Sequence, residues 1–454
     1  MSANRAPEVE TGVWPAHSSW NDAGEWLIAG VPVSDLVAQY GTPLYVLDEQ
    51  QIRDRALRIR RAFEAESARI GAHAHVYYAG KALLTRSIAR WVAEAGLKID
   101  VASGGEYAIA RSAGVAAEKL GFHGNNKSVA EIAVAVEEGV GSIVLDSAIE
   151  IERVAAAAER AGRRQAVRLR VNSGVHASTH DFLATAHEDQ KFGVTIADAP
   201  RLVARIRSFD SLEFLGVHCH IGSQIFGIDG FVESARRLLK LHTELLHDGP
   251  VPELNLGGGF GIAYRDGDEP PRIEHIARAI ADEVERTCRD LAIPIPDLAF
   301  EPGRWIVGNA GITLYEVGTT KSVALPDGGA RRYVSVDGGM SDNARPALYG
   351  AEYTACIVNR TSSAPPTLSR VVGKHCETGD ILVPESWLPD DTTPGDILAI
   401  AATGAYCYSL SSNYNALTRP ALVAVREGES RLIVRRETID DLLSRDLEPG
   451  EQRA

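Results

Sequence analysis

The stretch VYYAGKALLTRSIARWVAEAGLKIDVA, residues 76–102, holds the pattern that decides the fold. It begins and ends with a short apolar run. Between these runs, apolar side chains recur at the spacing of one helical face: Leu84, Ile88, Trp91 and Val92. A strand, a helix and a second strand in this order are typical of a βαβ unit, in which the two strands are parallel.

The same unit repeats along the chain. Eight apolar runs occur before residue 304: Val76–Ala79, Ile99–Ala102, Leu120–Phe122, Ile143–Leu145, Val167–Val171, Phe214–Ile221, Leu254–Leu256 and Leu298–Phe300. The first five begin about every 23 residues, which is enough for a strand, a helix and two short loops. Eight such units predict a closed (β/α)8 TIM barrel. An open doubly wound sheet, which usually has fewer strands, is the alternative.

The pattern changes after Gly308. Short, partly alternating runs separated by Gly, Pro and Asp follow: Ile312–Val317, Arg332–Val336, Tyr353–Val358, Ser369–Val372, Ile381–Val383, Ile397–Ala401, Ala421–Val425 and Arg431–Val434. They predict an antiparallel β-sandwich or β-barrel domain. The stretch Trp26–Val33 is also strand-like and is a candidate to join it. We therefore expect a barrel over residues 45–308 and a β domain made of residues 1–44 and 309–454.

Composition excludes several classes of protein. The 454 residues are 45% hydrophobic and 24% charged, as in a folded globular chain, and the formal charge of −14 disfavours binding to nucleic acid or to anionic membranes. No apolar run is long enough to span a membrane, and residues 1–12 lack the apolar core of a signal peptide. The five cysteines are scattered, which predicts neither disulfides nor a cysteine-based zinc site. We expect a soluble, cytoplasmic protein.

Polar residues lie where the predicted strands end. Active sites of (β/α)8 barrels lie at the carboxyl ends of the strands. In strand order, these ends carry Lys81; Asp100 and Ser103; His123 and Asn125; Asp146; Arg170 and Asn172; His218 and His220; Gly257–Gly261; and Glu301–Arg304. We therefore expect these residues to share one rim of the barrel.

Each of these residues has a functional and an ordinary interpretation. Lys81 is either a surface lysine or a partly desolvated nucleophile that forms a Schiff base. The Gly257–Gly259 triplet is either a tight turn or a backbone nest for phosphate. His218 and His220 point to one face of their strand, and either ligate a metal or fill the barrel. Because the sequence shows no converging cluster of His and Asp, we predict no metal site.

Glu301 ends a buried strand, where an unpaired carboxylate is costly. It either forms a salt bridge with Arg304 or keeps the ring nitrogen of pyridoxal phosphate (PLP) protonated, which makes the ring an electron sink. A Schiff-base lysine, a phosphate nest, a flat imidazole and such a carboxylate on one rim together describe a PLP site.

On these residues the chain resembles the fold type III PLP-dependent decarboxylases, and within them the diaminopimelate decarboxylases. The resemblance extends over nearly the whole length, from Gly41–Val46 to Arg419-Pro420. Its segments are Tyr78–Ala82, Asp100–Glu106, His187–Gly193, His218–Gln224, Gly257–Gly261, Glu301–Arg304, Val336–Met340, Gly373–Asp380 and Gly404–Tyr406. Gly80 departs from the family pattern, which commonly has a bulkier residue at this position.

The resemblance implies a role for each site residue. Lys81 would carry PLP, His220 would stack on its ring and Glu301 would pair with its nitrogen. The phosphate would be held by Ser223, Gly257, Gly258, Gly259 and Tyr406, and Asp100 and Arg170 would complete the cofactor site. Cys376 would donate the proton that replaces CO2, and would be contributed together with Glu377 by the partner subunit of a homodimer.

The implied reaction converts meso-2,6-diaminopimelate to L-lysine and CO2, the last step of bacterial lysine biosynthesis. The distal carboxylate of this amino-acid substrate needs Arg and its ammonium needs an acid. We assign Arg304, Arg345 and Tyr349 to the distal carboxylate and Glu377 to the distal ammonium, and we expect Tyr406 to contact the substrate as well. Decarboxylases of ornithine or arginine share the PLP residues and remain the alternative. A PLP racemase is disfavoured by Glu301, and a metal-dependent barrel hydrolase is a more distant possibility.

Overall fold

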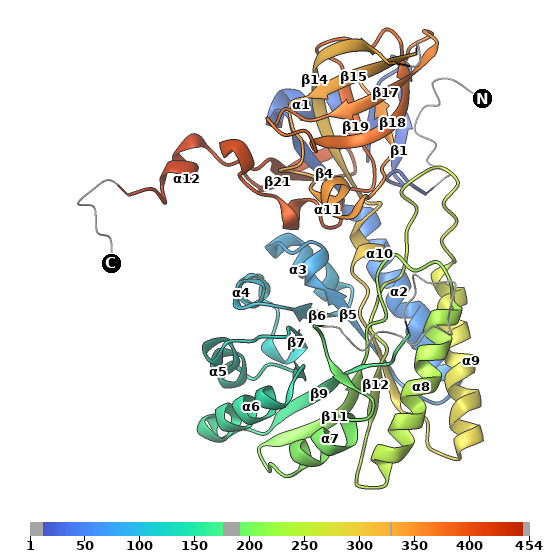
Figure 1. Ribbon diagram of the computed structural model, residues 1–454, viewed down its shortest axis with the longest axis vertical. Coiled ribbons are helices and arrows are strands. Elements are labelled where there is room, and N and C mark those ends of the chain that lie inside the picture. The colour runs from blue at the N-terminus through green and yellow to red at the C-terminus, as the bar shows by residue number, and fades with distance from the viewer. Residues whose placement is uncertain (1–11, 176–190, 327–328, 448–454) are drawn as a thin grey trace. The chain divides into compact units, whose positions relative to one another are not determined.

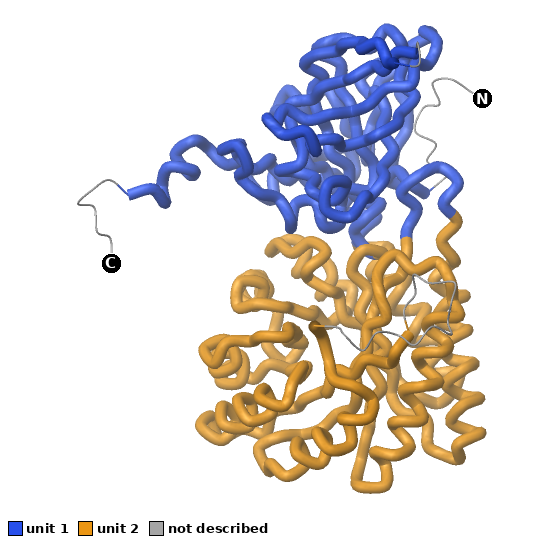
Figure 2. Tube along the Cα trace, in the orientation of Figure 1, with its two compact units in different colours: residues 1–52, 262–268, 306–454 blue, residues 53–261, 269–305 orange. Residues whose placement is uncertain are grey.

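The structure, a computed structural model, describes residues 12–175, 191–326 and 329–447. The segments Met1–Thr11 and His187–Gln190, on which two of the expectations above rest, lie outside the described residues. The chain forms two compact units (Figure 2). Unit 1 comprises Met1–Ile52, Ile262–Asp268 and Ile306–Ala454, and unit 2 comprises Arg53–Gly261 and Glu269–Trp305.

Unit 2 is a closed barrel of eight parallel strands (Figure 1). In order around the barrel these are β5 (Ala74–Ala79), β6 (Lys98–Val101), β7 (Leu120–Phe122), β8 (Ser142–Leu145), β9 (Gln165–Asn172), β11 (Leu212–His218), β12 (Glu253–Asn255) and β13 (Asp297–Phe300). Pairing of β13 with β5 closes the ring. A two-residue strand, β10 (Val194–Thr195), adds to β9. The predicted (β/α)8 barrel is thus confirmed, and the open doubly wound sheet is wrong.

Helices alternate with these strands, as the apolar periodicity predicts. They are α2 (Glu49–Arg69), whose first residues belong to unit 1, α3 (Arg86–Glu94), α4 (Gly104–Ser112), α5 (Val129–Glu138), α6 (Ala148–Ala161), α7 (Ala199–Arg207), α8 (Asp229–Leu246) and α9 (Ile273–Leu291). Thr85, Ser103 and Ser128 precede α3, α4 and α5, and each side chain accepts the N–H of the third residue after it. These caps fix the first turn of each helix.

An ion pair crosses the inside of the barrel. The guanidinium of Arg168 on β9 binds the carboxylate of Glu253 on β12, and it also donates hydrogen bonds to Tyr77 on β5 and Ser142 on β8. Arg168 and Glu253 are both buried. The barrel interior is therefore filled with polar as well as apolar side chains, and one guanidinium ties four strands together.

Unit 1 is built on a largely antiparallel sheet in the order β18-β17-β15-β14-β4-β20-β21, and β19 pairs with both β14 and β16. The bounds are β4 (Leu44–Asp48), β14 (Gly311–Ala324), β15 (Ala330–Val336), β16 (Ala355–Ile357), β17 (Pro366–Val372), β18 (Ile381–Pro389), β19 (Ile397–Ile400), β20 (Ala421–Arg426) and β21 (Glu429–Val434). Two pairs, β15–β17 and β4–β20, are parallel. The predicted C-terminal β domain is present.

The N-terminal part of unit 1 differs from the expectation in detail. The expected boundary at residue 45 falls on β4, whose five residues are buried and which pairs with β14 and β20, so β4 belongs to the sheet of unit 1. The Trp26–Val33 stretch instead supplies β2 (Trp26–Ile28) and β3 (Val31–Pro32), which form a separate small sheet with β1 (Ser18–Trp20) and are followed by α1 (Val33–Tyr40). Trp26 nevertheless packs in the same hydrophobic core as Leu314 of β14.

Three short helices complete the assigned helices: α10 (Arg304–Val307), α11 (Arg345–Tyr349) and α12 (Ile439–Leu443). Within the described ranges, every helix is too short or too polar to cross a membrane.

Candidate active site

Residues that end the barrel strands gather at one edge of unit 2. Lys81 lies in a helical turn, Gly80–Ala82, directly after β5. Its ammonium interacts electrostatically with Asp100 on β6, Arg170 on β9, and Glu301 and Arg304 after β13. The prediction that these polar residues share one rim therefore agrees with the geometry of unit 2.

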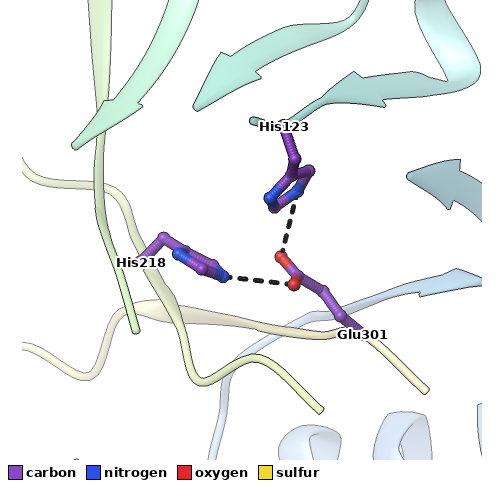
Figure 3. A group of neighbouring side chains, drawn as sticks. All are labelled: His123, His218 and Glu301. Atoms are coloured by element: carbon purple, nitrogen blue, oxygen red, sulfur yellow. Dashed lines mark hydrogen bonds and ion pairs between the residues drawn. The ribbon is translucent and has the colours of Figure 1, made fainter. Parts of the chain in front are cut away.

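Three side chains surround the carboxylate of Glu301, and Figure 3 shows two of them, His123 and His218. Asn255 Nδ2 donates to Glu301 Oε1 at 2.8 Å, and His218 Nε2 lies 3.1 Å from Oε2. His123 Nε2 lies 3.4 Å from Oε1 and 3.2 Å from Asp100 Oδ1. The rings of His123 and His218 meet edge to face at 5.1 Å. We call Asn255, His218 and His123 the Glu301 cage.

The pKa values of the two acids of this cluster, Glu301 and Asp100, are shifted in opposite directions. Burial alone would raise the pKa of Glu301, but its interactions with His218 and His123 outweigh burial and hold the pKa well below the usual range. Burial, and then the charge of Glu301, raise the pKa of Asp100 well above its usual range. Burial also lowers the pKa of His123 to about 4 and lowers that of His218. The negative charge of the pair is therefore favoured on Glu301 over Asp100.

Lys81 is placed to act as a nucleophile. Its side chain keeps contact with solvent, but the surrounding protein desolvates the ammonium and lowers its pKa, an effect that Glu301 opposes. A lower pKa increases the fraction of neutral amine, which is the form that attacks a carbonyl. The preceding Gly80 allows close packing, because a Cβ there would lie 2.9 Å from the carbonyl oxygen of Asp100. The departure from the family pattern at Gly80 thus has a local packing reason.

The Gly257–Gly259 loop has no room for side chains. A Cβ would lie 2.4 Å from the carbonyl oxygen of Cys219 at position 257, 2.0 Å from that of Glu301 at position 258, and 2.3 Å from that of Gly222 at position 259. Gly257 and Gly259 also have positive φ angles of 68° and 104°. The loop therefore exposes backbone rather than side chains, as a phosphate nest requires.

His220 lies beside this loop. Its Nδ1 accepts a hydrogen bond from Gly258 N–H at 3.4 Å, and burial lowers the pKa of the imidazole to about 3. The ring is therefore neutral, with its proton on Nε2. A neutral flat ring suits stacking on an aromatic ligand.

Two further cofactor candidates have partners within unit 2. Arg304 donates from a terminal guanidinium nitrogen to Ser223 Oγ at 2.8 Å, so the predicted phosphate ligand and the predicted carboxylate ligand are neighbours. Arg170 Nε lies 3.9 Å from Asp146 Oδ1, and its guanidinium stacks on Phe192 at 4.4 Å. Both arginines thus have fixed positions at the rim.

Cys376 and Glu377 lie in unit 1, on an exposed loop that several hydrogen bonds fix in place. Cys376 N–H donates to Asn415 Oδ1 at 3.1 Å, and Glu377 Oε2 accepts from Tyr414 OH at 3.2 Å. The buried His375 anchors the loop through a 2.9 Å contact between its Nδ1 and the carboxylate of Asp380. The Cys376 thiol itself is free and exposed. The loop that carries this thiol is therefore anchored, while the thiol remains accessible.

Arg345, Tyr349 and Tyr406 also lie in unit 1. Arg345 is buried at the start of α11, where its guanidinium donates to Tyr353 OH at 2.5 Å and lies 6.0 Å from the centre of the Tyr406 ring. No carboxylate forms an ion pair with Arg345 among the described residues, so this cation suits an anionic ligand. Tyr349, at the end of the same helix, is 70% exposed.

The sequence analysis missed Asn255 and gave His123 and His218 no partner. The signal was present for the histidines, since both end apolar runs, but pairing them with Glu301 needs the order of strands around the barrel. His123, His218 and Glu301 also place three possible metal ligands within 4.8 Å of one another. The expectation of no converging cluster is therefore wrong, although hydrogen bonding to Glu301 already accounts for the arrangement.

The chain matches known families and relatives over most of its length. The family model described as "Pyridoxal-dependent decarboxylase, pyridoxal binding domain" matches residues 50–308, more than half of the chain. Diaminopimelate decarboxylase of Mycobacterium tuberculosis (strain ATCC 25618 / H37Rv) is 49% identical, over 97% of this chain and 99% of its own length. Diaminopimelate decarboxylase of Bacillus subtilis (strain 168) is 42% identical, over 95% and 97%.

Solved structures give the same result. The crystal structure of diaminopimelate decarboxylase from M. jannaschii in complex with L-lysine has a TM-score of 0.88 at 33% identity, and the match covers 95% of this chain and 98% of that one. Lysine/ornithine decarboxylase from Vibrio vulnificus, solved with putrescine, has a TM-score of 0.71 at 21% identity, over 87% and 97%. The latter likeness extends to the fold alone.

Proposed function

Because this chain belongs to the family of pyridoxal-dependent decarboxylases, we propose that it removes CO2 from meso-2,6-diaminopimelate and releases L-lysine, the last step of bacterial lysine biosynthesis. The relatives of 42–49% identity carry the name of this activity, whereas the ornithine-decarboxylating neighbour is only 21% identical. The observation that carries the proposal is the meeting of Lys81 and an ionised Glu301 at one barrel rim.

The residues of unit 2 fit the cofactor of the family. PLP, when bound through a lysine, withdraws the electrons that the departing CO2 leaves on the substrate. Lys81 supplies the amine, and the ionised Glu301 provides the partner that a protonated ring nitrogen needs. The Gly257–Gly259 backbone is the cradle for phosphate, and Ser223 and Tyr406 are its proposed side-chain ligands. His220 would stack on the ring.

We assign the remaining contacts with the cofactor to Asp100 and Arg170. Burial and the charge of Glu301 raise the pKa of Asp100, which disfavours a second negative charge beside Glu301. Arg170 supplies a fixed positive charge at the same rim.

The remaining residues would recognise the substrate and complete its reaction. We assign Arg345 and Arg304 to the distal carboxylate, together with Tyr349, and Tyr406 to a further substrate contact. The guanidinium of Arg345 is buried and pairs with no carboxylate among the described residues, which favours an anionic ligand. Glu377 would pair with the distal ammonium. Cys376 would protonate the carbon that has lost CO2, since its thiol is exposed and its loop is anchored by Asn415 and Asp380.

We further propose that the enzyme is a homodimer in which Cys376 and Glu377 serve the partner subunit's site. The exposed apolar side chains of Leu348 and Tyr349, 60% and 70% exposed, support an interface near this part of unit 1. The cytoplasmic location of the protein, which we expect from the sequence, stays a prediction.

A direct test compares substrates. Purified protein loaded with PLP is incubated separately with meso-diaminopimelate, L-ornithine and L-arginine, and CO2 release is followed. We expect release from diaminopimelate only, with L-lysine as the product. Preferred decarboxylation of ornithine or arginine would replace the proposal with its alternative.

A further inference from the structure

Asn255, the last residue of β12, contacts two different parts of the site. Its Oδ1 accepts Gly257 N–H at 2.9 Å, and its Nδ2 donates to Glu301 Oε1 at 2.8 Å. A backbone N–H is only a donor, so it fixes which end of the amide faces Gly257. The other end, Nδ2, is then only a donor toward Glu301, and Oε1 must accept. The fold thus disfavours a proton on Oε1.

His218 constrains the second oxygen in the same way. It lies fully buried on β11, and its Nε2 is 3.1 Å from Glu301 Oε2. Its Nδ1 has no hydrogen-bond partner among the described side chains and backbone. A neutral imidazole carries one proton, and the only acceptor within reach here is Oε2, so that proton lies on Nε2. Both oxygens of Glu301 therefore receive a hydrogen bond.

We propose that Asn255 and His218 are positioning residues that keep Glu301 ionised and fixed, and that Asn255 also locks this carboxylate to the first glycine of the phosphate loop. The inference rests on the proposed function, because it concerns the carboxylate that would meet the ring nitrogen of PLP. Asn255 then sets the distance between the groups that hold the two ends of one cofactor.

The other groups around Glu301 explain why the hydrogen bonds from Asn255 and His218 matter for its ionisation. The titratable groups that face it are Lys81, Asp100, His123, His218 and His220, from the ends of four strands, β5, β6, β7 and β11. Asp100 is the second acid among them. Without the hydrogen bonds from Asn255 and His218 to Glu301, the negative charge could lie on Asp100 instead of Glu301. Removal of a donor raises the pKa of Glu301, and protonated Glu301 no longer holds the ring nitrogen in its charged form.

His218→Phe and His218→Gln form the matched pair that tests this inference. Phe fills the space without donating, whereas Gln retains a donor. The visible absorption of bound PLP is titrated without substrate, and the pH dependence of kcat is measured with substrate. For His218→Phe we expect the acid limb of both profiles to move up by about one to two pH units, the usual effect of one hydrogen bond to a buried charge. His218→Gln should retain the wild-type profiles.

Asn255→Leu provides a second, independent readout. It should shift the same acid limb and, because the Gly257 N–H loses its acceptor, also weaken PLP binding at least about tenfold. The control is Asn21→Leu, which removes a 2.9 Å hydrogen bond from the backbone N–H of Glu25 to Asn21 Oδ1 in unit 1. Should His218→Phe fail to fold, Asn255→Leu carries the test of the acid limb.

The outcomes separate the inference from the proposed function. Wild-type profiles in folded His218→Phe, or equal shifts in the Phe and Gln variants, would overturn the positioning role even in an active diaminopimelate decarboxylase. The cofactor titration contains no amino acid, so it tests the role whichever substrate is decarboxylated. A wild-type chain that binds no PLP would refute both.

Discussion

The guanidinium of Arg168 and the carboxylate of Glu253 form an ion pair inside the barrel, where their side chains are only 2% and 8% exposed. Tyr77 and Ser142 satisfy further guanidinium donors. A buried pair of this kind contributes little net stability over an apolar pair, but each member depends on the other. The stability of the barrel is therefore sensitive to the loss of either side chain.

Arg168→Ala should therefore destabilise unit 2 strongly. Loss of one partner leaves Glu253 as a buried, uncompensated charge, which costs about 3–5 kcal/mol in the free energy of unfolding. Denaturant titration followed by circular dichroism measures it. The double variant Arg168→Met with Glu253→Leu should recover much of the loss. A cost below about 1 kcal/mol for Arg168→Ala would show that water reaches the pair.

Lys81 should be the residue that carries the cofactor. Purified protein should be yellow, and borohydride should fix the cofactor covalently to Lys81, as peptide mass analysis would show. Lys81→Ala should abolish turnover, because it removes the nucleophile. Reduction products on another lysine would refute this assignment.

Glu301→Gln tests the role of the negative charge on Glu301. It should raise the barrier to decarboxylation by about 3–4 kcal/mol, as expected for a preorganised electrostatic partner. Steady-state kcat reports the change, and the melting temperature must be measured alongside, since Gln presents an N–H2 group to Asn255 or His218. Near-normal kcat in a folded variant would make Glu301 a structural residue.

The shared site can be tested by subunit exchange. Homodimers of Lys81→Ala and of Cys376→Ala should each be nearly inactive, and mixing should create one intact site in each heterodimer. About half of the dimers in a statistical mixture are heterodimers, so activity should recover to about a quarter of wild type. If exchange is confirmed by mass and activity stays absent, Cys376 serves its own subunit.

Metal removal examines the other use of His123, His218 and Glu301. Dialysis against a strong chelator should leave both PLP content and decarboxylation unchanged, because Glu301 already occupies the hydrogen-bonding nitrogen of His218. Elemental analysis of the dialysed and untreated protein supplies the control. Activity that disappears with the chelator and returns with a divalent metal would assign the cluster to metal binding.

Much of the fold and part of the site follow from local sequence patterns. Apolar runs at a regular spacing predict the barrel because each run and helix is a local feature, and parallel strands place Lys81 and Glu301 on one edge. Contacts across the barrel are not local. Nothing near Asn255 in the sequence indicates its bond to Glu301, and nothing near Leu44 indicates that β4 pairs with β14, about 260 residues later.

The position of β4 has a consequence for how the protein is made. This strand leaves the ribosome early, yet its two neighbours, β14 and β20, come from the last third of the chain. At roughly 5–20 residues per second, its apolar residues wait on the order of tens of seconds before β14 emerges. All the strands of the barrel are synthesised in that interval, so unit 2 has the opportunity to fold first. Until β14 emerges, β4 is an unpaired apolar strand, a kind of segment that is prone to aggregation.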